Sequence, residues 1–284
     1  MHHNTTINWN DIWKTQMQRH LELTCCTCDK MWDSIQGASQ YLSQAQTCQW
    51  DVGLLDRHPV FTHLPPKSRI LDIGAGPGTH SIPLALRGHQ ITAVEPAFGM
   101  VTTLQQRQTH HQLTTIDIIQ KRWEDIDIHH DLPHHYDIAL ASFSLGMIDI
   151  QQAIQNMQEC AHTVVLLWHV GVPTWEELYL QIWEKLHGYP YYPLPKSECL
   201  LNIIQSMNIH PQVTLDKFSC FYRFETMQHA CKYFESELNI ITRQQKHLLH
   251  SLLDDILLWK NDEFRLEGTT HYAIFSWETA ANSS

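Results

Sequence analysis

A glycine-rich turn between a strand and a helix constrains this sequence more than any other feature. The stretch RILDIGAGPGTHSIPLALRG covers residues 69–88, and Gly74, Gly76 and Gly78 occupy every second position in it. The apolar run before the turn predicts a buried strand, and the run after it predicts a helix that ends at Gly88. Glycine has no Cβ and adopts backbone angles that other residues avoid, so a ligand can approach such a turn closely. The pattern therefore predicts a nucleotide-like ligand at the end of a strand.

Apolar strands and helices continue to alternate through residues 68–170. Further strands are predicted at QITAVEP, TTIDIIQKRW, YDIALASFSL and TVVLLWHV, and helices at FGMVTTLQQRQTH and DIQQAIQNMQECA. This alternation is typical of a parallel sheet that is covered by helices on both faces. We therefore expect an α/β fold.

The rest of the chain is predominantly helical in pattern. The N-terminal part has an apolar residue at every fourth position: Trp9, Trp13, Met17 and Leu21. Such a stripe predicts an amphipathic helix. We expect a helical N-terminal cap over residues 1–60 and one main domain over 61–284, with a helical insertion at about 172–210. A leucine-rich stripe over residues 248–256 predicts a further helix that packs into a core.

Composition disfavours several functional classes. The net charge is −11, and the 19 lysines and arginines form no cluster, which argues against binding to a nucleic-acid backbone. No apolar run reaches the 18 residues that a membrane span needs, and no leader pattern is seen, so we expect a cytoplasmic protein without a membrane partner. The CCTC stretch at residues 25–28 and the histidine pairs lack a second ligand pair. We expect no metal, although a metal role for Cys25, Cys26 and Cys28 or for the histidine clusters stays open.

Two acidic residues narrow the choice of ligand. Glu95 ends the second predicted strand, where a carboxylate can accept both hydroxyls of a ribose, and this alone also fits NAD. The dinucleotide fingerprint requires glycine at the position of Thr79. Asp72 precedes the turn, where a carboxylate would repel a pyrophosphate and attract a cation. S-adenosylmethionine carries a sulfonium and an ammonium group and no phosphate, so the pattern favours this cofactor over a dinucleotide.

The motifs LDIGAGPGT, ITAVEP, WEDI and YDIALASFSLGMID follow one another over residues 68–170. In this order and spacing they resemble the class I S-adenosylmethionine-dependent methyltransferase superfamily, in a prokaryotic branch whose substrates are unassigned. The resemblance implies a Rossmann-like, doubly wound, mostly parallel seven-stranded sheet with an antiparallel closing hairpin near residues 212–224 and 271–277. It also implies an enzyme that converts S-adenosylmethionine to S-adenosylhomocysteine.

The resemblance also implies a set of cofactor-binding residues. Asp72 and the turn backbone would hold the methionine part, and Glu95 would hold the ribose. The other members would pack near the adenine or line the methyl-transfer site, and Trp123 could instead be an ordinary core aromatic. In one departure, Arg122 stands where many relatives carry an aspartate for the adenine amino group. The set comprises Asp72, Gly74, Ala75, Gly76, Gly78, Glu95, Pro96, Met100, Trp123, Glu124 and Ser142.

Two residues are candidates for catalysis, because ligands in such sheets lie beyond the carboxyl ends of the strands. His169 follows the fifth strand and is the first candidate for a general base, with a structural histidine as the alternative. Ser144 follows the fourth strand and would border the methyl group. Trp13, Tyr41 and Trp50 would cover the site or hold the cap in place.

The predicted function is methyl transfer to an O, N or S atom of a small-molecule acceptor. The alternatives are a protein methyltransferase and a regulatory protein that binds the cofactor and has lost catalysis. The sequence also lacks the N/D-P-P-Y/F run that enzymes methylating nucleic-acid bases carry after the fourth strand.

Overall fold

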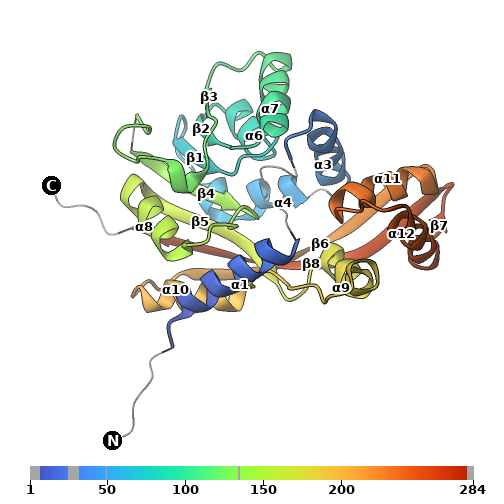
Figure 1. Cartoon of the computed structure of the whole chain (residues 1–284). Coiled ribbons are helices and arrows are strands. Elements are labelled where there is room, and N and C mark those ends of the chain that lie inside the picture. The colour runs from blue at the N-terminus through green and yellow to red at the C-terminus, as the bar shows by residue number, and fades with distance from the viewer. Residues whose placement is uncertain (1–6, 25–31, 49, 134, 280–284) are drawn as a thin grey trace, which may run out of the picture.

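A single mixed β-sheet runs through the molecule, in the strand order β3-β2-β1-β4-β5-β8-β6 (Figure 1). The computed structural model describes residues 7–24, 32–48, 50–133 and 135–279. From β3 to β5 all neighbours are parallel, whereas β8 is antiparallel to both β5 and β6. The predicted fold is therefore confirmed, closing hairpin included. The strands are β1 (Arg69–Ile73), β2 (Gln90–Val94), β3 (Ile116–Ile119), β4 (Tyr136–Ser142), β5 (Ala161–Val170), β6 (Gln212–Phe224), β7 (Leu258–Lys260) and β8 (Glu263–Glu278).

Helices cover both faces of the sheet, so the central strands are apolar on both sides. Along β5, Leu166 faces one core and Leu167 faces the other, because successive side chains of a strand alternate between faces. Within the described residues, the helices are α1 (Trp9–Thr24), α3 (Ile35–Cys48), α4 (Trp50–Arg57), α5 (Pro59–Thr62), α6 (Ser81–Leu86), α7 (Phe98–His110), α8 (Ile150–Cys160), α9 (Thr174–His187), α10 (Ser197–Ser206), α11 (Met227–Glu237) and α12 (Arg243–Ile256), with a 3-10 turn at Trp123–Asp125.

A third core lies beyond the edge of the main sheet. Strands β6 and β8 extend past their neighbours, and α9, α11 and α12 pack there, at the right of Figure 1. Leu178, Phe234 and Leu253 are among its fully buried members. The segment expected as one insertion at 172–210 is thus divided, because α9 joins this third core while α10 packs with α1 against the main sheet.

The N-terminal helices are attached to the sheet at several points. The Trp13 indole Nε1 donates to the carbonyl oxygen of Met147 (2.9 Å). Arg57 pairs with Asp216 on β6 at 3.1 Å. The start of α3 lies so close to α7 that a Cβ on Gly99 would meet the Ser34 backbone at 2.5 Å. Among the described helices, none is both long and apolar enough to cross a membrane.

Candidate active site

The glycine turn after β1 requires its glycines. Gly74, Gly76 and Gly78 all have positive φ, at 68°, 56° and 80°, a region that L side chains avoid. Space is the second constraint, because a Cβ on Gly74 would lie 2.3 Å from the Cβ of Ser144 and one on Gly78 would lie 2.4 Å from Leu104 Cδ1. The turn therefore lies directly against the segment that follows β4.

The N–H groups of this turn are used within the protein. Those of Gly74 and Ala75 donate to the carbonyl of Val94 at 2.8 and 3.2 Å, and that of Gly76 donates to Glu95 Oε2 at 2.9 Å. Among the described residues, no donor reaches the carbonyl oxygens of Gly74 and Gly76. The turn therefore offers acceptors to a ligand, an arrangement that suits an ammonium group better than a phosphate.

Asp72 is a buried carboxylate beneath the turn. It is 2% exposed, and its Oδ2 accepts a hydrogen bond from Ser81 Oγ at 2.5 Å. Burial is the main cause that raises the pKa of Asp72 to about 6, the Ser81 hydrogen bond acts against it, and repulsion by Glu95 adds to it. The ionised form is disfavoured as long as no cation lies nearby.

Glu95 is held at the end of β2 by two backbone groups. Its Oε1 accepts from the N–H of Ala97 at 2.9 Å, and its Oε2 accepts from Gly76. Each carboxylate oxygen can accept more than one hydrogen bond, which is the capacity that recognition of two ribose hydroxyls requires.

Met100 lies beside this carboxylate and turn. A Cβ on Gly76 would be 4.0 Å from Met100 Sδ. Met100 and Ala97 form a small buried cluster with Trp32 and Tyr41 packed against it, so α3 covers this side of the turn. The structure thus brings Asp72, the turn, Glu95 and Met100 together.

Trp123 has a different environment from these residues. It is 3% exposed and belongs to the core under α8, and its Nε1 donates to the carbonyl of Ala153 at 3.1 Å. Glu124 is exposed and Pro96 is partly exposed. The burial of Trp123 agrees with the alternative of an ordinary core aromatic.

The segment after β4 is fixed by three hydrogen bonds. Ser142 Oγ lies 3.0 Å from His80 Nε2, and Ser144 Oγ donates to the carbonyl of Ile73 at 2.6 Å. Phe143 between them donates its N–H to Leu167 (3.1 Å) and has a φ of 54°. A bulky residue in this region is strained by about 1–3 kcal/mol. Sequence reasoning missed His80, whose signal is its place directly after the turn; burial lowers its pKa to about 4.

His169 lies at the carboxyl end of β5. It is 9% exposed, and burial, followed by the charge of Lys196, lowers its pKa to about 3. Its Nδ1 is buried and has no hydrogen-bond partner among the described residues. His169 is therefore neutral at physiological pH and retains an unused ring nitrogen, although such a low pKa makes it a weak base.

A buried ion pair lies next to His169. Glu176 is fully buried and pairs with Lys196, whose side chain is 16% exposed. The N–H of Leu194 donates to Glu176 at 3.1 Å, and the Tyr191 hydroxyl is 3.4 Å away. This pair holds the segment between α9 and α10 against the end of β5.

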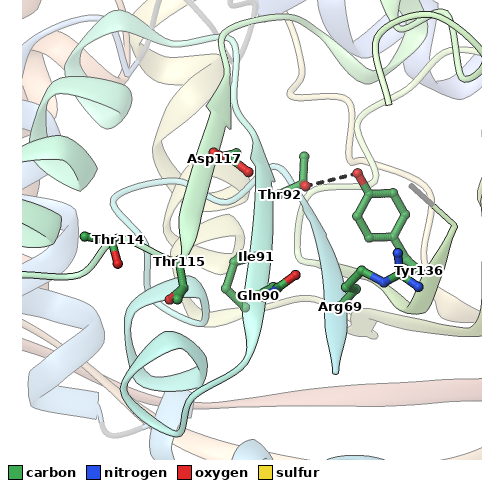
Figure 2. Close-up of a pocket in the computed structure, with 8 residues that line it drawn as sticks. All are labelled: Arg69, Gln90, Ile91, Thr92, Thr114, Thr115, Asp117 and Tyr136. Carbon is green, nitrogen blue, oxygen red and sulfur yellow. Dashed lines mark hydrogen bonds between the residues drawn. The ribbon is translucent and has the colours of Figure 1, made fainter. Parts of the chain in front are cut away.

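A cavity of about 220 Å³ lies at the amino-terminal ends of the parallel strands (Figure 2). In it, the Tyr136 hydroxyl donates to Thr92 Oγ1 at 3.0 Å. The cavity opens at the amino ends of the parallel strands, away from the glycine turn, and is separate from the candidate site. Its lining consists of Arg69, Gln90, Ile91, Thr92, Thr114, Thr115, Asp117 and Tyr136.

Part of the predicted set lies outside the described structure. Cys25, Cys26 and Cys28 are outside the described residues, as is the side chain of Trp50. Within the described ranges, no group of three or more His, Cys, Asp or Glu side chains is arranged to hold a metal ion.

Residues 70–165 match the family model of the methyltransferase domain. This part of the chain is similar to methyltransferase domains, and the fold is the Rossmann-like methyltransferase fold. The chain is 26% identical, over 211 residues, to an uncharacterized protein from Haemophilus influenzae, and the match covers 73% of this chain and 75% of that protein.

Solved structures share the fold of this chain at low sequence identity. The YcgJ protein from Bacillus subtilis matches with a TM-score of 0.52 and 12% identity, over 80% of this chain and 98% of that one. Phosphoethanolamine N-methyltransferase 2 from Haemonchus contortus, solved with phosphomonomethylethanolamine and S-adenosylhomocysteine, matches with a TM-score of 0.53 and 12% identity. That match covers 96% of this chain and 60% of that one.

Proposed function

We propose that this protein transfers the methyl group of S-adenosylmethionine to a small-molecule acceptor. The observation that carries the proposal is the environment of the turn, where a buried carboxylate lies close to carbonyl oxygens that no donor among the described residues reaches. A cation placed there would stabilise the ionised form of Asp72, which burial disfavours. A pyrophosphate would meet Asp72, Glu95 and carbonyl oxygens, all of which repel it.

Different residues of the chain would bind different parts of the cofactor. Asp72 and the carbonyls of Gly74 and Gly76 would bind the amino-acid part, and Glu95 would accept hydrogen bonds from the ribose hydroxyls. Met100, under Tyr41, would contact the base. Ser142 and Ser144 fix the backbone that faces the reacting methyl group.

S-adenosylmethionine, when bound, supplies a methyl group on a sulfonium that is ready for displacement. A lone pair of the acceptor forms the new bond to the methyl carbon, and the electron pair of the breaking C–S bond stays on sulfur. Alignment is the main task of the protein in such a reaction. An acceptor O–H, N–H or S–H also loses a proton, which His169 Nδ1 or water can take; with a pKa of about 3, His169 serves better as a hydrogen-bond acceptor than as a strong base.

The covering of the site favours a small acceptor over a protein. Helix α1 and the segment between α9 and α10 are joined over the ends of β4 and β5, where Trp13 donates to Met147. The Tyr189 hydroxyl donates to the carbonyl of Leu23 at 2.9 Å, and His20 Nδ1 lies 2.7 Å from the carbonyl of Tyr192. A protein substrate would need an open cleft at this position.

Calorimetry with S-adenosylhomocysteine tests the cofactor assignment. We expect Asp72→Asn and Glu95→Gln to weaken binding roughly 10- to 100-fold, because each removes hydrogen bonds to a charged group. Asp117→Asn is the matched control, because Asp117 lines the cavity at the amino-terminal ends of the parallel strands. This variant should leave the affinity unchanged. Unaltered affinity in both site variants would disprove the assignment, and binding without turnover across a broad acceptor panel would favour a regulatory protein.

A further inference from the structure

The residues around His169 form a partly exposed aromatic cluster, which we define as Phe143, His169, Trp175, Phe218 and Tyr272. Ring centroids lie 4.8 Å apart for Phe143 and His169, 6.3 Å for His169 and Trp175 and 6.0 Å for Phe143 and Phe218. Tyr272 lies 5.5 Å from Phe143. Phe143, Trp175 and Phe218 keep part of their surface exposed. The cluster borders the end of β4, where the proposed methyl transfer takes place.

We propose that this aromatic cluster binds the acceptor, and that the acceptor is a flat, uncharged molecule whose hydroxyl or N–H group contacts His169. The inference rests on the proposed function, because it names the class of acceptor for that site. Three features of the cluster support it.

The first feature is the strained backbone of Phe143. A glycine or asparagine would adopt its φ of 54° at little cost, whereas a bulky side chain does so unfavourably. The flanking serines hold the segment in place through His80 and the Ile73 carbonyl. The ring packs against the core and the neighbouring rings, and part of its surface stays exposed beside the end of β4, so the strained backbone presents an aromatic surface at the place where an acceptor would bind.

The second feature is the pairing of the nearby charges. Lys196 is neutralised by Glu176. Asp216, which accepts a hydrogen bond from the Tyr272 hydroxyl at 3.0 Å, is paired with Arg57. The charged groups beside the aromatic cluster are therefore compensated in pairs. An anionic acceptor would have to displace Glu176 from Lys196, whereas an uncharged ring stacks on the cluster without disturbing either pair.

The third feature is the unused nitrogen of His169. Its Nδ1 is buried without a hydrogen-bond partner among the described residues, and buried polar atoms in native structures are nearly always satisfied. A hydroxyl or N–H group on a stacked acceptor would satisfy it.

Binding of 1-naphthol to the protein saturated with S-adenosylhomocysteine tests the inference, with 1-naphthoate as the flat but charged comparison. We expect saturable binding of naphthol, and binding of naphthoate at least 10-fold weaker. Phe143→Leu should weaken naphthol binding about 3- to 10-fold, the size of an aromatic pair contact. Trp259→Leu, an exposed aromatic on β7, is the control and should have no effect.

Two further variants separate ligand contact from structural support. Phe143→Gly relieves the strained backbone but removes the aromatic ring, so it should lose naphthol binding while the affinity for S-adenosylhomocysteine is kept. His169→Asn can retain a hydrogen-bonding group near Nδ1 and should bind naphthol more tightly than His169→Leu. The inference is overturned if naphthol does not bind, if naphthoate binds equally well, or if the Phe143 variants bind naphthol as the wild type does. Absence of S-adenosylhomocysteine binding to the wild type would instead contradict the proposed function.

Discussion

At the scale of single residues, the fold holds Asp72 where its charge is unfavourable. The carboxylate is buried, and Glu95 adds a second negative charge nearby. Such an arrangement lowers the stability of the free protein and becomes favourable once a cation binds. If the proposed function is correct, the cost in stability and the affinity for a cationic ligand have the same origin.

The pH dependence of stability should reveal this group. Its pKa rises from 3.8 to about 6 on folding, so the folded state binds the proton more tightly than the unfolded state. The stability contributed by the protonated group is complete below pH 4 and is lost as the pH rises through 6, by up to about 3 kcal/mol. Asp72→Asn should remove this part of the decline, as measured by urea unfolding at pH 4, 5, 6 and 7. Equal pH profiles for both proteins would contradict the prediction.

At the scale of elements, the segment between α9 and α10 is fixed at several points. Glu176 accepts from the N–H of Leu194 and pairs with Lys196. Trp168 Nε1 donates to the carbonyl of Pro195 at 2.7 Å. These contacts fix a segment of irregular backbone in place beside β5.

Removing one member of the buried pair of Glu176 and Lys196 should lower the free energy of unfolding more than removing both. Lys196→Met leaves the Glu176 charge buried without its partner, which typically costs about 3–5 kcal/mol. The double variant Lys196→Met/Glu176→Gln should recover most of that loss. Urea unfolding of the two single variants and the double variant measures the coupling, and additive losses would show that the pair is not coupled.

The sequence predicts an element well when the residues of that element themselves form a clear apolar pattern. The strands of the parallel half are continuous apolar runs and were found as such, and the expected 212–224 strand coincides with β6. Strand β8 begins at Glu263 rather than near residue 271, because its first half, EFRLEGTT, carries charges and pairs with β6 outside the main sheet. Helix α11 was not predicted.

The candidate site shows the same division between local and long-range signals. Asp72 and Glu95 are predicted from the sequence because each has a fixed local relation to the glycine turn, and their role in cofactor binding stays a prediction. His80 meets Ser142, and Lys196 meets Glu176, only through the tertiary fold. The positive φ of Phe143 has no local signal either, since it is imposed by contacts on both sides.

At the scale of the whole molecule, the third core stands apart from the two cores of the main sheet. It joins them through β6, β8 and the start of α9, where a Cβ on Gly268 would lie 2.3 Å from Thr174 Oγ1. Figure 1 shows α11 and α12 at the far end of this hairpin, away from β1 and β2. Loss of packing there should therefore remain local.

Leu253→Ala tests whether a loss of packing in the third core leaves the rest of the molecule unaffected. Leu253 is fully buried in the third core, and such truncations cost about 2–5 kcal/mol. Hydrogen exchange should become faster in α9, α11 and α12 and in the paired outer ends of β6 and β8, while β1 and β4 keep their protection. Affinity for S-adenosylhomocysteine should be unchanged. Equally faster exchange in β1 would show that the cores unfold together.

The long hairpin has an evolutionary consequence. The segment between Phe224 and Glu263 pairs with none of the parallel strands, so a change in its length leaves the register of the strands that carry the glycine turn unaltered. The aromatic cluster, in contrast, draws Phe218 from β6 and Trp175 from α9, which also packs on the hairpin. Descendants of such a chain could thus exchange the molecule they modify while inheriting the same donor chemistry.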